Sequence, residues 1–426
     1  MTIRARVKQL AKWIAESVLI LMITLVLLEA GLWALSAVNQ KVSYLTATGK
    51  DTNLLDPVLE RRLDPNYPGH DRDGFRNTAV LEQADVVALG DSMTYGMFVA
   101  PESAWPQQLA RQSGESVYNM GVSGYGPVHY LILTPRALQK HPKWLVSTLY
   151  DGNDLFDSFR LAHWNPQMSD LLSKDTALIA AIDKAQSVED FDSLANRLSG
   201  FSSEDIHAFL GDNKASFDWK SKLIDYFKRH CKTWNLVRSA RLLMLQSGTS
   251  AQSGLLGRIF WKYSRWKAAK SSGLLVAFER GSLKTVFMPS YRAVVLRLDD
   301  PRIREGLSIT EEAYRRSAKE TRATNTQFSI LMIPTKELVY YQAFSNTGDK
   351  AIQQVSELAS LELAFRAQFK RDICDQGIMC IDPLPALTDA LKAGQNPFPM
   401  SHDGHPNPLG PSILADSVRR AIEPKR

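Results

Sequence analysis

The chain has 426 residues, 44% of them apolar, and a formal net charge of +6 at pH 7. This length and composition allow a sizeable buried core in one large domain or two ordinary ones. The charge is too small to indicate a nucleic-acid-binding protein, and the sequence contains no zinc-finger or aromatic-basic RNA signature. A mildly basic surface suits contact with an anionic membrane or an acidic glycan equally well.

The first predicted element is a membrane-spanning helix. The run from Ser17 to Val38 has 22 residues and a single charge, Glu29, and about 20 residues are needed to cross a bilayer. Positively charged flanks stay in the cytoplasm, and four basic residues precede the run: Arg4, Arg6, Lys8 and Lys12. We therefore predict a cytoplasmic segment over 1–12, a single transmembrane helix over 13–38 and a periplasmic or otherwise extracytoplasmic domain on a bacterial inner membrane. A signal peptide cleaved near Ala34 to Ala37 is the alternative.

Glu29 is unusual because a carboxylate inside a membrane span is costly and often functional. We expect it to be protonated or to lie near the outer interface. The alternative is that it contacts a partner membrane protein.

Residues 39–78 form a polar, proline-containing lead-in, and an alternation of short apolar runs with helical stretches follows. Such alternation predicts βαβ units and a mostly parallel sheet. Helices are predicted over Trp105 to Gln112 and Ile413 to Ile422. The predicted strands are Ala84 to Leu89, Ser116 to Val122, Lys143 to Tyr150, Phe328 to Pro334 and Gly377 to Ile381.

Residues 155–304 interrupt this alternation, and we interpret them as a mostly helical insertion into a core domain of residues 79–154 and 305–426. The insertion contains a helical pattern from Trp219 to His230 and a predicted hairpin from Leu274 to Met288 with its turn at Gly281 and Ser282. The aromatic-basic run from Phe260 to Lys270 is predicted to be a solvated amphipathic face, with contact to lipid headgroups as the alternative.

The three cysteines do not form a metal-binding pattern. Cys374 and Cys380 lie close together, but neither a second cysteine pair nor a nearby histidine pair accompanies them, so the spacing does not match a zinc site. Outside the cytoplasm these two cysteines can form a disulfide. Two unpaired thiols are the alternative, and the sequence does not distinguish between them.

Gly90-Asp91-Ser92 is the strongest chemical motif, because it follows an apolar strand and precedes a helix-compatible stretch. A serine at such a turn presents its hydroxyl at the carboxyl edge of the sheet, where open α/β folds bind ligands. The following helix N-terminus offers N–H groups to a developing oxyanion. Taken alone, a Gly-Asp-Ser sequence is usually only a turn.

Three further loops carry polar or glycine-rich motifs. The segment from Asn119 to Gly126 contains Gly121 and Gly124, whose backbone can approach a ligand closely. The order of its glycines does not fit a dinucleotide loop. Asn153 follows the third predicted strand and can donate to an oxyanion, although an Asn-Asp turn is the simpler explanation.

Asp403-Gly404-His405 precedes the last predicted helix, and this places a base beside a carboxylate that can orient it. A serine needs such a base to become nucleophilic at neutral pH. Because all four motifs stand at strand ends or before the last helix, they are expected to meet at one edge of one sheet. Together they supply a nucleophile, a base, an orienting acid and oxyanion donors.

This set of motifs resembles the SGNH (GDSL-type) hydrolase superfamily. The resemblance implies a flavodoxin-like three-layer α/β/α sandwich and acyl transfer through a serine. It implies that Ser92 is the nucleophile, that His405 is the base, and that the oxyanion hole consists of the Ser92 and Gly124 N–H groups with the Asn153 side chain. Gly121 is an alternative to Gly124. Neither a metal nor an organic cofactor is implied.

The last motif departs from the usual Asp-x-x-His spacing of the superfamily, which would put the acid at position 402, where this chain has His402. The Asp-x-His spacing is similar to that of SGNH-like proteins that acetylate alginate and related exopolysaccharides. Ile333 to Glu337 is also similar to a Pro-Thr-Lys segment of those proteins. We predict Asp403 as the orienting acid, with a backbone carbonyl or a distant carboxylate as the alternative.

The predicted function is a serine-dependent esterase that acts outside the cytoplasm on an acyl ester of a glycan or lipid. One alternative is a polysaccharide O-acyltransferase that receives its acyl group from a membrane partner. A second alternative is a non-catalytic membrane-anchored scaffold. The catalytic groups serve hydrolysis and transfer equally, so the sequence does not separate the first two.

Overall fold

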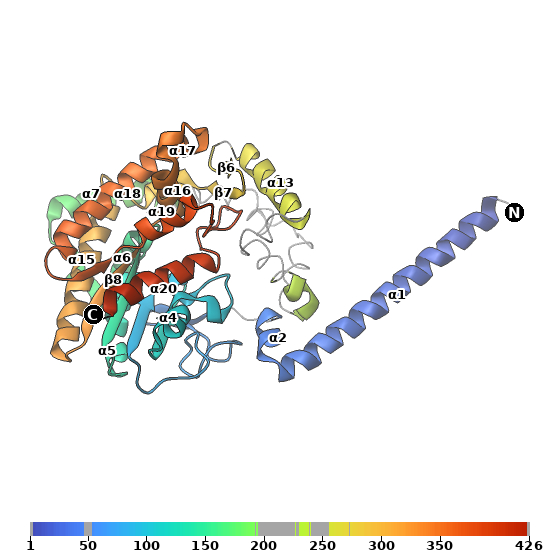
Figure 1. The fold of residues 1–426 in the computed structure, drawn as a ribbon, viewed down its shortest axis with the longest axis horizontal. Coiled ribbons are helices and arrows are strands. Elements are labelled where there is room, and N and C mark those ends of the chain that lie inside the picture. The colour runs from blue at the N-terminus through green and yellow to red at the C-terminus, as the bar shows by residue number, and fades with distance from the viewer. Residues whose placement is uncertain are drawn as a thin grey trace.

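The computed structural model describes residues 3–46, 53–191, 193–194, 226, 230–237, 239, 255–271 and 273–423. Only Tyr226 and His230 of the predicted helix from Trp219 to His230 lie within these ranges. Figure 1 shows a body built on one sheet, with the N-terminal helix projecting from it.

The central sheet has five strands in the order β4-β3-β5-β8-β9, and every neighbouring pair is parallel. The predicted strands are all confirmed, with their ends moved by at most two residues. The strands are β3 (Val86–Gly90), β4 (Val117–Gly121), β5 (Trp144–Tyr150), β8 (Gln327–Ile333) and β9 (Met379–Ile381).

Apolar side chains on alternate positions of these strands face opposite sides of the sheet. In β3, Val87 and Leu89 pack into one apolar cluster, whereas Val86 and Ala88 pack into another. Both faces are therefore buried, which explains why the strands are continuous apolar runs rather than alternating ones.

Helices cover both faces, so the predicted three-layer α/β/α sandwich is confirmed (Figure 1). The first face is covered by α5 (Pro127–Leu138), α6 (Asp154–Trp164), α15 (Pro301–Ala323) and α18 (Ser356–Phe369). The second face is covered by α4 (Trp105–Ser113), α16 (Lys336–Phe344), α19 (Leu384–Lys392) and α20 (Leu409–Ile422). Helix α6 lies in the same layer as α5 and α15, although it begins at the predicted edge of the insertion.

Two antiparallel hairpins and several short helices surround the sandwich. The predicted hairpin between Leu274 and Met288 is confirmed, and Gly281 in its turn has a φ of 60°. The hairpins are β1 (Asn53–Asp56) with β2 (Glu60–Leu63), and β6 (Val276–Arg280) with β7 (Leu283–Phe287). The other helices are α2 (Gln40–Leu45), α3 (Ser92–Tyr95), η1 (Pro101–Ser103), η2 (Pro166–Leu171), α7 (Thr176–Val188), α13 (Leu255–Lys270), α14 (Pro289–Val294), η4 (Ser345–Thr347), α17 (Lys350–Gln354) and η5 (Lys370–Cys374).

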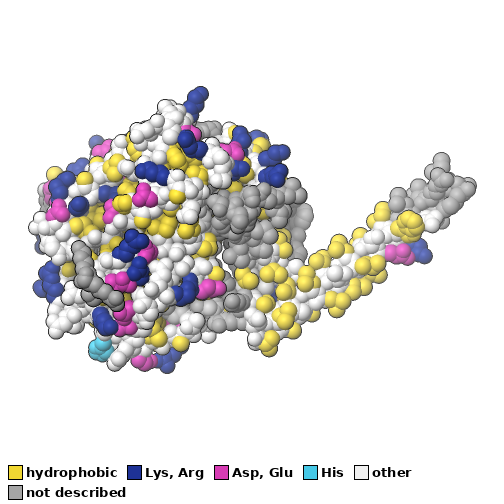
Figure 2. Space-filling view, in the orientation of Figure 1, with side chains coloured by type: hydrophobic (Ala, Val, Ile, Leu, Met, Phe, Trp, Pro, Cys, Tyr) yellow, Lys and Arg dark blue, Asp and Glu magenta, His cyan; other side chains and the backbone are white. Residues whose placement is uncertain are grey.

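Helix α1 (Ile3–Val38) contains one segment long and apolar enough to cross a membrane, Lys12–Val38. Figure 2 shows hydrophobic side chains along the exposed surface of this helix. The Glu29 carboxylate accepts hydrogen bonds from the backbone N–H groups of Lys232 and Thr233, at 2.6 and 2.8 Å. Glu29 therefore has partners within its own chain.

Cys374 and Cys380 form a disulfide, which ties η5 to the edge strand β9. Of the two possibilities left open by the sequence, the structure contains the bridged one. Cys231 is a free cysteine beside Glu29.

Candidate active site

Three loops meet at the carboxyl edge of the sheet. The nucleophile loop follows β3, the glycine loop follows β4, and the loop containing Asn153 follows β5. Because β3 lies between β4 and β5, the nucleophile loop has the other two as its neighbours. This is the arrangement that the shared position of the motifs predicted.

Ser92 is the first residue of α3, and the preceding Asp91 caps that helix by accepting a 2.9 Å hydrogen bond from the N–H of Met93. Gly90 allows this turn because a Cβ there would lie only 2.0 Å from the Thr94 hydroxyl and 2.3 Å from the Thr148 hydroxyl. The serine is largely buried.

His405 connects the C-terminal loop to the nucleophile. Its Nε2 lies 2.8 Å from the Ser92 Oγ, and its Nδ1 lies 2.6 Å from an oxygen of Asp403. An ionised carboxylate only accepts hydrogen bonds, so Nδ1 carries the proton and Nε2 is left to accept the hydroxyl proton. The structure thus brings together the three residues predicted as nucleophile, base and acid.

The short Asp-x-His spacing is accommodated by a tight turn. The same Asp403 oxygen that contacts the imidazole also accepts the backbone N–H of His405 at 2.8 Å. Burial acts to raise the pKa of Asp403, but the neighbouring His405, its hydrogen bonds and Lys336 outweigh burial and lower the pKa to about 2. The carboxylate is therefore ionised at every pH at which the protein is expected to work.

Lys336 stabilises this turn through hydrogen bonds. Its buried ammonium donates to the backbone carbonyls of Ser401 and Asp403, each at 2.8 Å. Burial lowers the pKa of Lys336 to about 8, against the opposing effects of Glu337 and Asp403. The lysine in the segment from Ile333 to Glu337 thus stabilises the loop that contains His405.

The predicted oxyanion donors lie on both sides of Ser92. Gly124 follows β4 with a φ of +78°, a left-handed conformation that favours glycine. The alternative donor, Gly121, already gives its N–H to the Asn119 side chain at 2.8 Å. Asn153 precedes α6, and its side-chain nitrogen lies 2.7 Å from an oxygen of Asp157.

Several buried carboxyl groups lie under these loops. Burial raises the pKa of Asp91 to about 6, although its bond from Met93 and the neighbouring His405 lower it. Burial and the nearby Asp91 raise the pKa of Asp154 well above its ordinary value. Asp154 also accepts the backbone N–H of Tyr150 at 2.9 Å.

Sequence reasoning missed four residues that border the site. The ring of Phe98 lies edge-on to His405 with 5.4 Å between centroids, and Asp157, Arg160 and Glu60 lie behind Asn153 and Gly124. Only the four-residue spacing of Asp157 from Asn153 was visible as a signal, because it places both on one face of a helix. Phe98 and Glu60 had no signal, since their contacts are long-range.

Residues 88–200 match the model of the GDSL-like Lipase/Acylhydrolase family. This part of the chain is therefore similar to the GDSL-like acylhydrolases. The matched residues include the nucleophile loop, the glycine loop and Asn153, whereas Asp403 and His405 lie outside them. The expected resemblance to exopolysaccharide acetylation proteins is not among these findings.

The following solved structure is among those similar to this chain. It belongs to a protein assigned to the G-D-S-L lipolytic family from Desulfitobacterium hafniense DCB-2, with 11% identity and a TM-score of 0.31, over 79% of this chain and 98% of that one. That score is too low to carry an inference. No curated protein matches the sequence.

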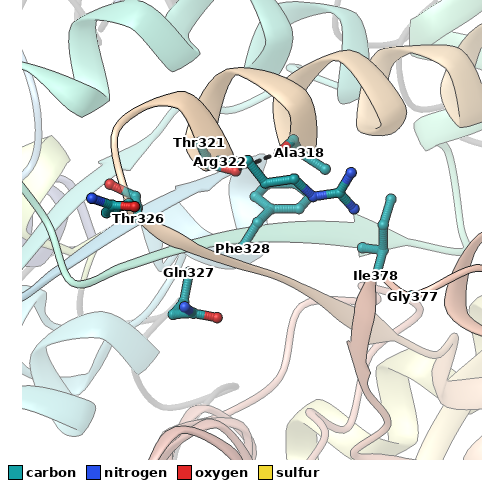
Figure 3. Close-up of a pocket in the computed structure, with 9 residues that line it drawn as sticks. Ala318, Thr321, Arg322, Thr326, Gln327, Phe328, Gly377 and Ile378 are labelled. Carbon is teal, nitrogen blue, oxygen red and sulfur yellow. Dashed lines mark hydrogen bonds between the residues drawn. The ribbon is translucent and has the colours of Figure 1, made fainter.

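A cavity of about 290 Å³ lies away from this GDSL-like site (Figure 3). It is lined by the end of α15 and the beginning of β8, including Arg322 and Phe328. Strand β8 crosses the sheet before reaching the edge that carries the three loops, so the cavity is not part of the site. Among the described residues, no group of His, Cys, Asp or Glu side chains is arranged to hold a metal ion.

Proposed function

We propose that this protein is a serine-dependent ester hydrolase of the SGNH type that acts outside the cytoplasm on an acyl ester of a glycan or lipid. The observation that supports it most is the 2.8 Å contact between His405 Nε2 and Ser92 Oγ, with Asp403 on the other imidazole nitrogen. The match of residues 88–200 to a family of acylhydrolases supports it. A non-catalytic scaffold would not need Asp403, His405 and Ser92 connected by hydrogen bonds.

In the proposed reaction, the Ser92 Oγ attacks the ester carbonyl carbon while its proton moves to His405 Nε2. The Ser92 and Gly124 N–H groups and the Asn153 amide stabilise the oxyanion. Collapse of the tetrahedral intermediate expels the alcohol, which takes the proton from Nε2. A water molecule then attacks the acyl-serine, His405 accepts its proton, and the acid departs as the proton returns to Ser92.

The test is active-site labelling of the purified full chain with a fluorophosphonate, followed by a panel of acyl esters. We expect one label per chain at Ser92 and ester hydrolysis, and loss of both in Ser92→Ala. A wild-type protein that folds, as judged by its melting temperature, but takes no label would overturn the hydrolase proposal.

We also propose that α1 anchors the domain to the membrane with the N-terminus in the cytoplasm. The Lys12–Val38 segment has the length and composition of a span, and the Cys374–Cys380 disulfide is typical of oxidising compartments. Intact mass after expression distinguishes the anchor from a cleaved signal peptide. Thiol labelling with and without reductant then shows on which side of the membrane the domain lies.

The short turn from Asp403 to His405 favours a second candidate, a polysaccharide O-acyltransferase that works with a membrane partner. This spacing is similar to that of SGNH-like proteins that acetylate exopolysaccharides. The two candidates differ in what resolves the acyl-serine, water or a sugar hydroxyl. An aryl acetate donor with an added uronate oligosaccharide separates them, because only a transferase adds an acetyl group to the sugar.

A further inference from the structure

We propose that Asp157 and Arg160 form a brace that positions both predicted oxyanion donors, Asn153 and Gly124, and that the two braced residues act through those donors rather than on the substrate. The inference rests on the proposed hydrolase function. It assigns a role to two residues of α6 that take no part in the proton transfer between Ser92 and His405.

The first contact of the brace fixes the Asn153 side chain. The Asn153 nitrogen donates to Asp157 at 2.7 Å, and the Asn153 side-chain oxygen is buried without a hydrogen-bond partner among the described residues. A carboxylate accepts but does not donate, so it selects the orientation in which the amide nitrogen faces it. That orientation leaves the second N–H of the amide available for an oxyanion.

The second contact connects this carboxylate to the glycine loop. The Arg160 guanidinium donates to the other Asp157 oxygen at 3.3 Å and to the backbone carbonyl of Gly124 at 3.4 Å. Gly126 also lies close to the helix, because a Cβ there would be 2.9 Å from the Asp157 Cβ. One carboxylate–guanidinium pair therefore connects the loops on either side of Ser92.

The lead-in hairpin completes the brace. Glu60 in β2 lies 3.2 Å from Arg160, and the Tyr125 hydroxyl of the glycine loop donates to the Arg61 carbonyl at 2.5 Å. A Cβ at Gly124 would lie 3.2 Å from the Arg61 guanidinium. The hairpin thus packs on the outer side of the glycine loop, where it limits movement of Gly124.

The charge on Asp157 controls the first contact. Burial raises the pKa of Asp157 to about 7, and Arg160 and Arg61 oppose this while Asp91 and Glu60 add to it. Asp154 on the same helix and Tyr291 on α14 also face it. Below this pH the protonated Asp157 carboxyl can donate a hydrogen bond to the Asn153 side-chain oxygen. The amide is then no longer held with its nitrogen facing Asp157.

The experiment compares full-length wild type, Asp157→Asn, Asn153→Ala and the double variant on a soluble aryl ester between pH 5 and 9. We expect Asp157→Asn to lower kcat about 10- to 100-fold, less than the ~10²–10³-fold loss of an oxyanion donor, with KM within about twofold. In the Asn153→Ala background, Asp157→Asn should have no further effect. The acid limb of kcat should involve two protons in wild type and one in Asp157→Asn.

Arg160→Gln tests the second contact and should also lower kcat, with Arg160→Lys restoring part of it. The matched control is Arg316→Gln. Arg316 of α15 pairs with Glu312 of the same helix and with Asp170 of η2, away from the predicted oxyanion donors, so the kinetics of this variant should equal those of wild type. Equal losses from Asp157→Asn in the presence and absence of Asn153, or an unchanged acid limb, would overturn the brace. If the fluorophosphonate labels Ser92 in wild type, the hydrolase proposal stands, and such a result contradicts the brace alone.

If Asp157→Asn does not fold, Asp157→Glu and Arg160→Lys test the same proposal. Both variants keep the charge but shift the position of the charged group in the Asp157–Arg160 pair. The brace predicts that each lowers kcat without a matching change in the melting temperature. A fall in melting temperature with unchanged kcat would assign the pair to stability alone and overturn the proposal.

Discussion

The side of the site formed by Ser92, His405 and Asp403 differs from the side formed by Gly124 and Asn153 in how its geometry is held. Asp403 contacts His405 within one three-residue turn, through two hydrogen bonds to the same oxygen. The other side depends on contacts that join β2, the glycine loop and α6. Local geometry therefore positions His405, the proposed base, whereas the packing of distant segments positions the proposed oxyanion donors.

This difference predicts two kinds of failure. A change on the proton-transfer side removes a chemical group that nothing else replaces. A change behind the oxyanion side leaves the donors in the chain but less well oriented, so partial activity should remain.

The largest effect is expected for His405→Gln, because the imidazole lies 2.8 Å from the Ser92 hydroxyl, whereas the Asp91 carboxylate accepts from that hydroxyl at a longer 3.4 Å. We expect kcat to fall about 10⁴- to 10⁶-fold, as for other serine hydrolases that lose the base. Steady-state kinetics measures the loss, and an unchanged melting temperature shows that the fold persists. Activity within tenfold of wild type would mean that another group takes the proton.

Asp403→Asn should come next, with kcat lowered about 10²- to 10⁴-fold, because an amide no longer selects the tautomer that accepts the serine proton. The pKa of Asp403 is lowered to about 2, so the hydrogen bonds that its carboxylate accepts from His405 stabilise the fold above the unfolded pKa of about 4, and this stability is lost as the pH falls towards 2. Thermal melting from pH 2 to 7 should show this loss in wild type and not in the variant. If Asp403→Asn keeps full activity, a different group orients His405.

Lys336→Met should lower kcat about tenfold, because the methionine cannot hold the carbonyls of Ser401 and Asp403 and the buried carbonyls lose hydrogen bonds. This prediction tests how local the proton-transfer side is. A loss of kcat as large as that of Asp403→Asn would show that the turn from Asp403 to His405 needs Lys336 to keep its conformation. Kinetics and melting temperature are measured together, and Lys336→Arg is the charge-preserving comparison.

The smallest effect on activity is expected for Asp154→Asn, which should instead stabilise the fold. Burial raises the pKa of Asp154, so the stabilising neutral form is fully populated below the unfolded pKa of about 4, and the stability is lost as the pH rises towards the folded pKa. Asparagine stays neutral and can still accept the N–H of Tyr150. Its melting temperature should exceed that of wild type by a few degrees at pH 8 and match it at pH 4.

The parts of the molecule that follow from local patterns were predictable. Continuous apolar runs such as Ala84 to Leu89 indicated buried strands, and Ser92 and His405 were found because each stands in a motif next to a strand or helix. Asp403 was predicted as well, even though its spacing departs from the common one. The tight turn that explains this spacing was visible only in three dimensions.

The amino-acid sequence by itself determined the strands, the apolar N-terminal segment and the residues expected at the sheet edge, because periodicity and turn chemistry act between near neighbours. Only the tertiary structure decided the strand order, the pairing of Cys374 with Cys380 and the partners of Glu29. It alone joined Asp157 and Arg160 to Gly124 and Glu60. Apart from the Cys374–Cys380 bridge, whose cysteines are six residues apart, those contacts join residues that are far apart in the chain, and no local pattern records which distant segments will pack together.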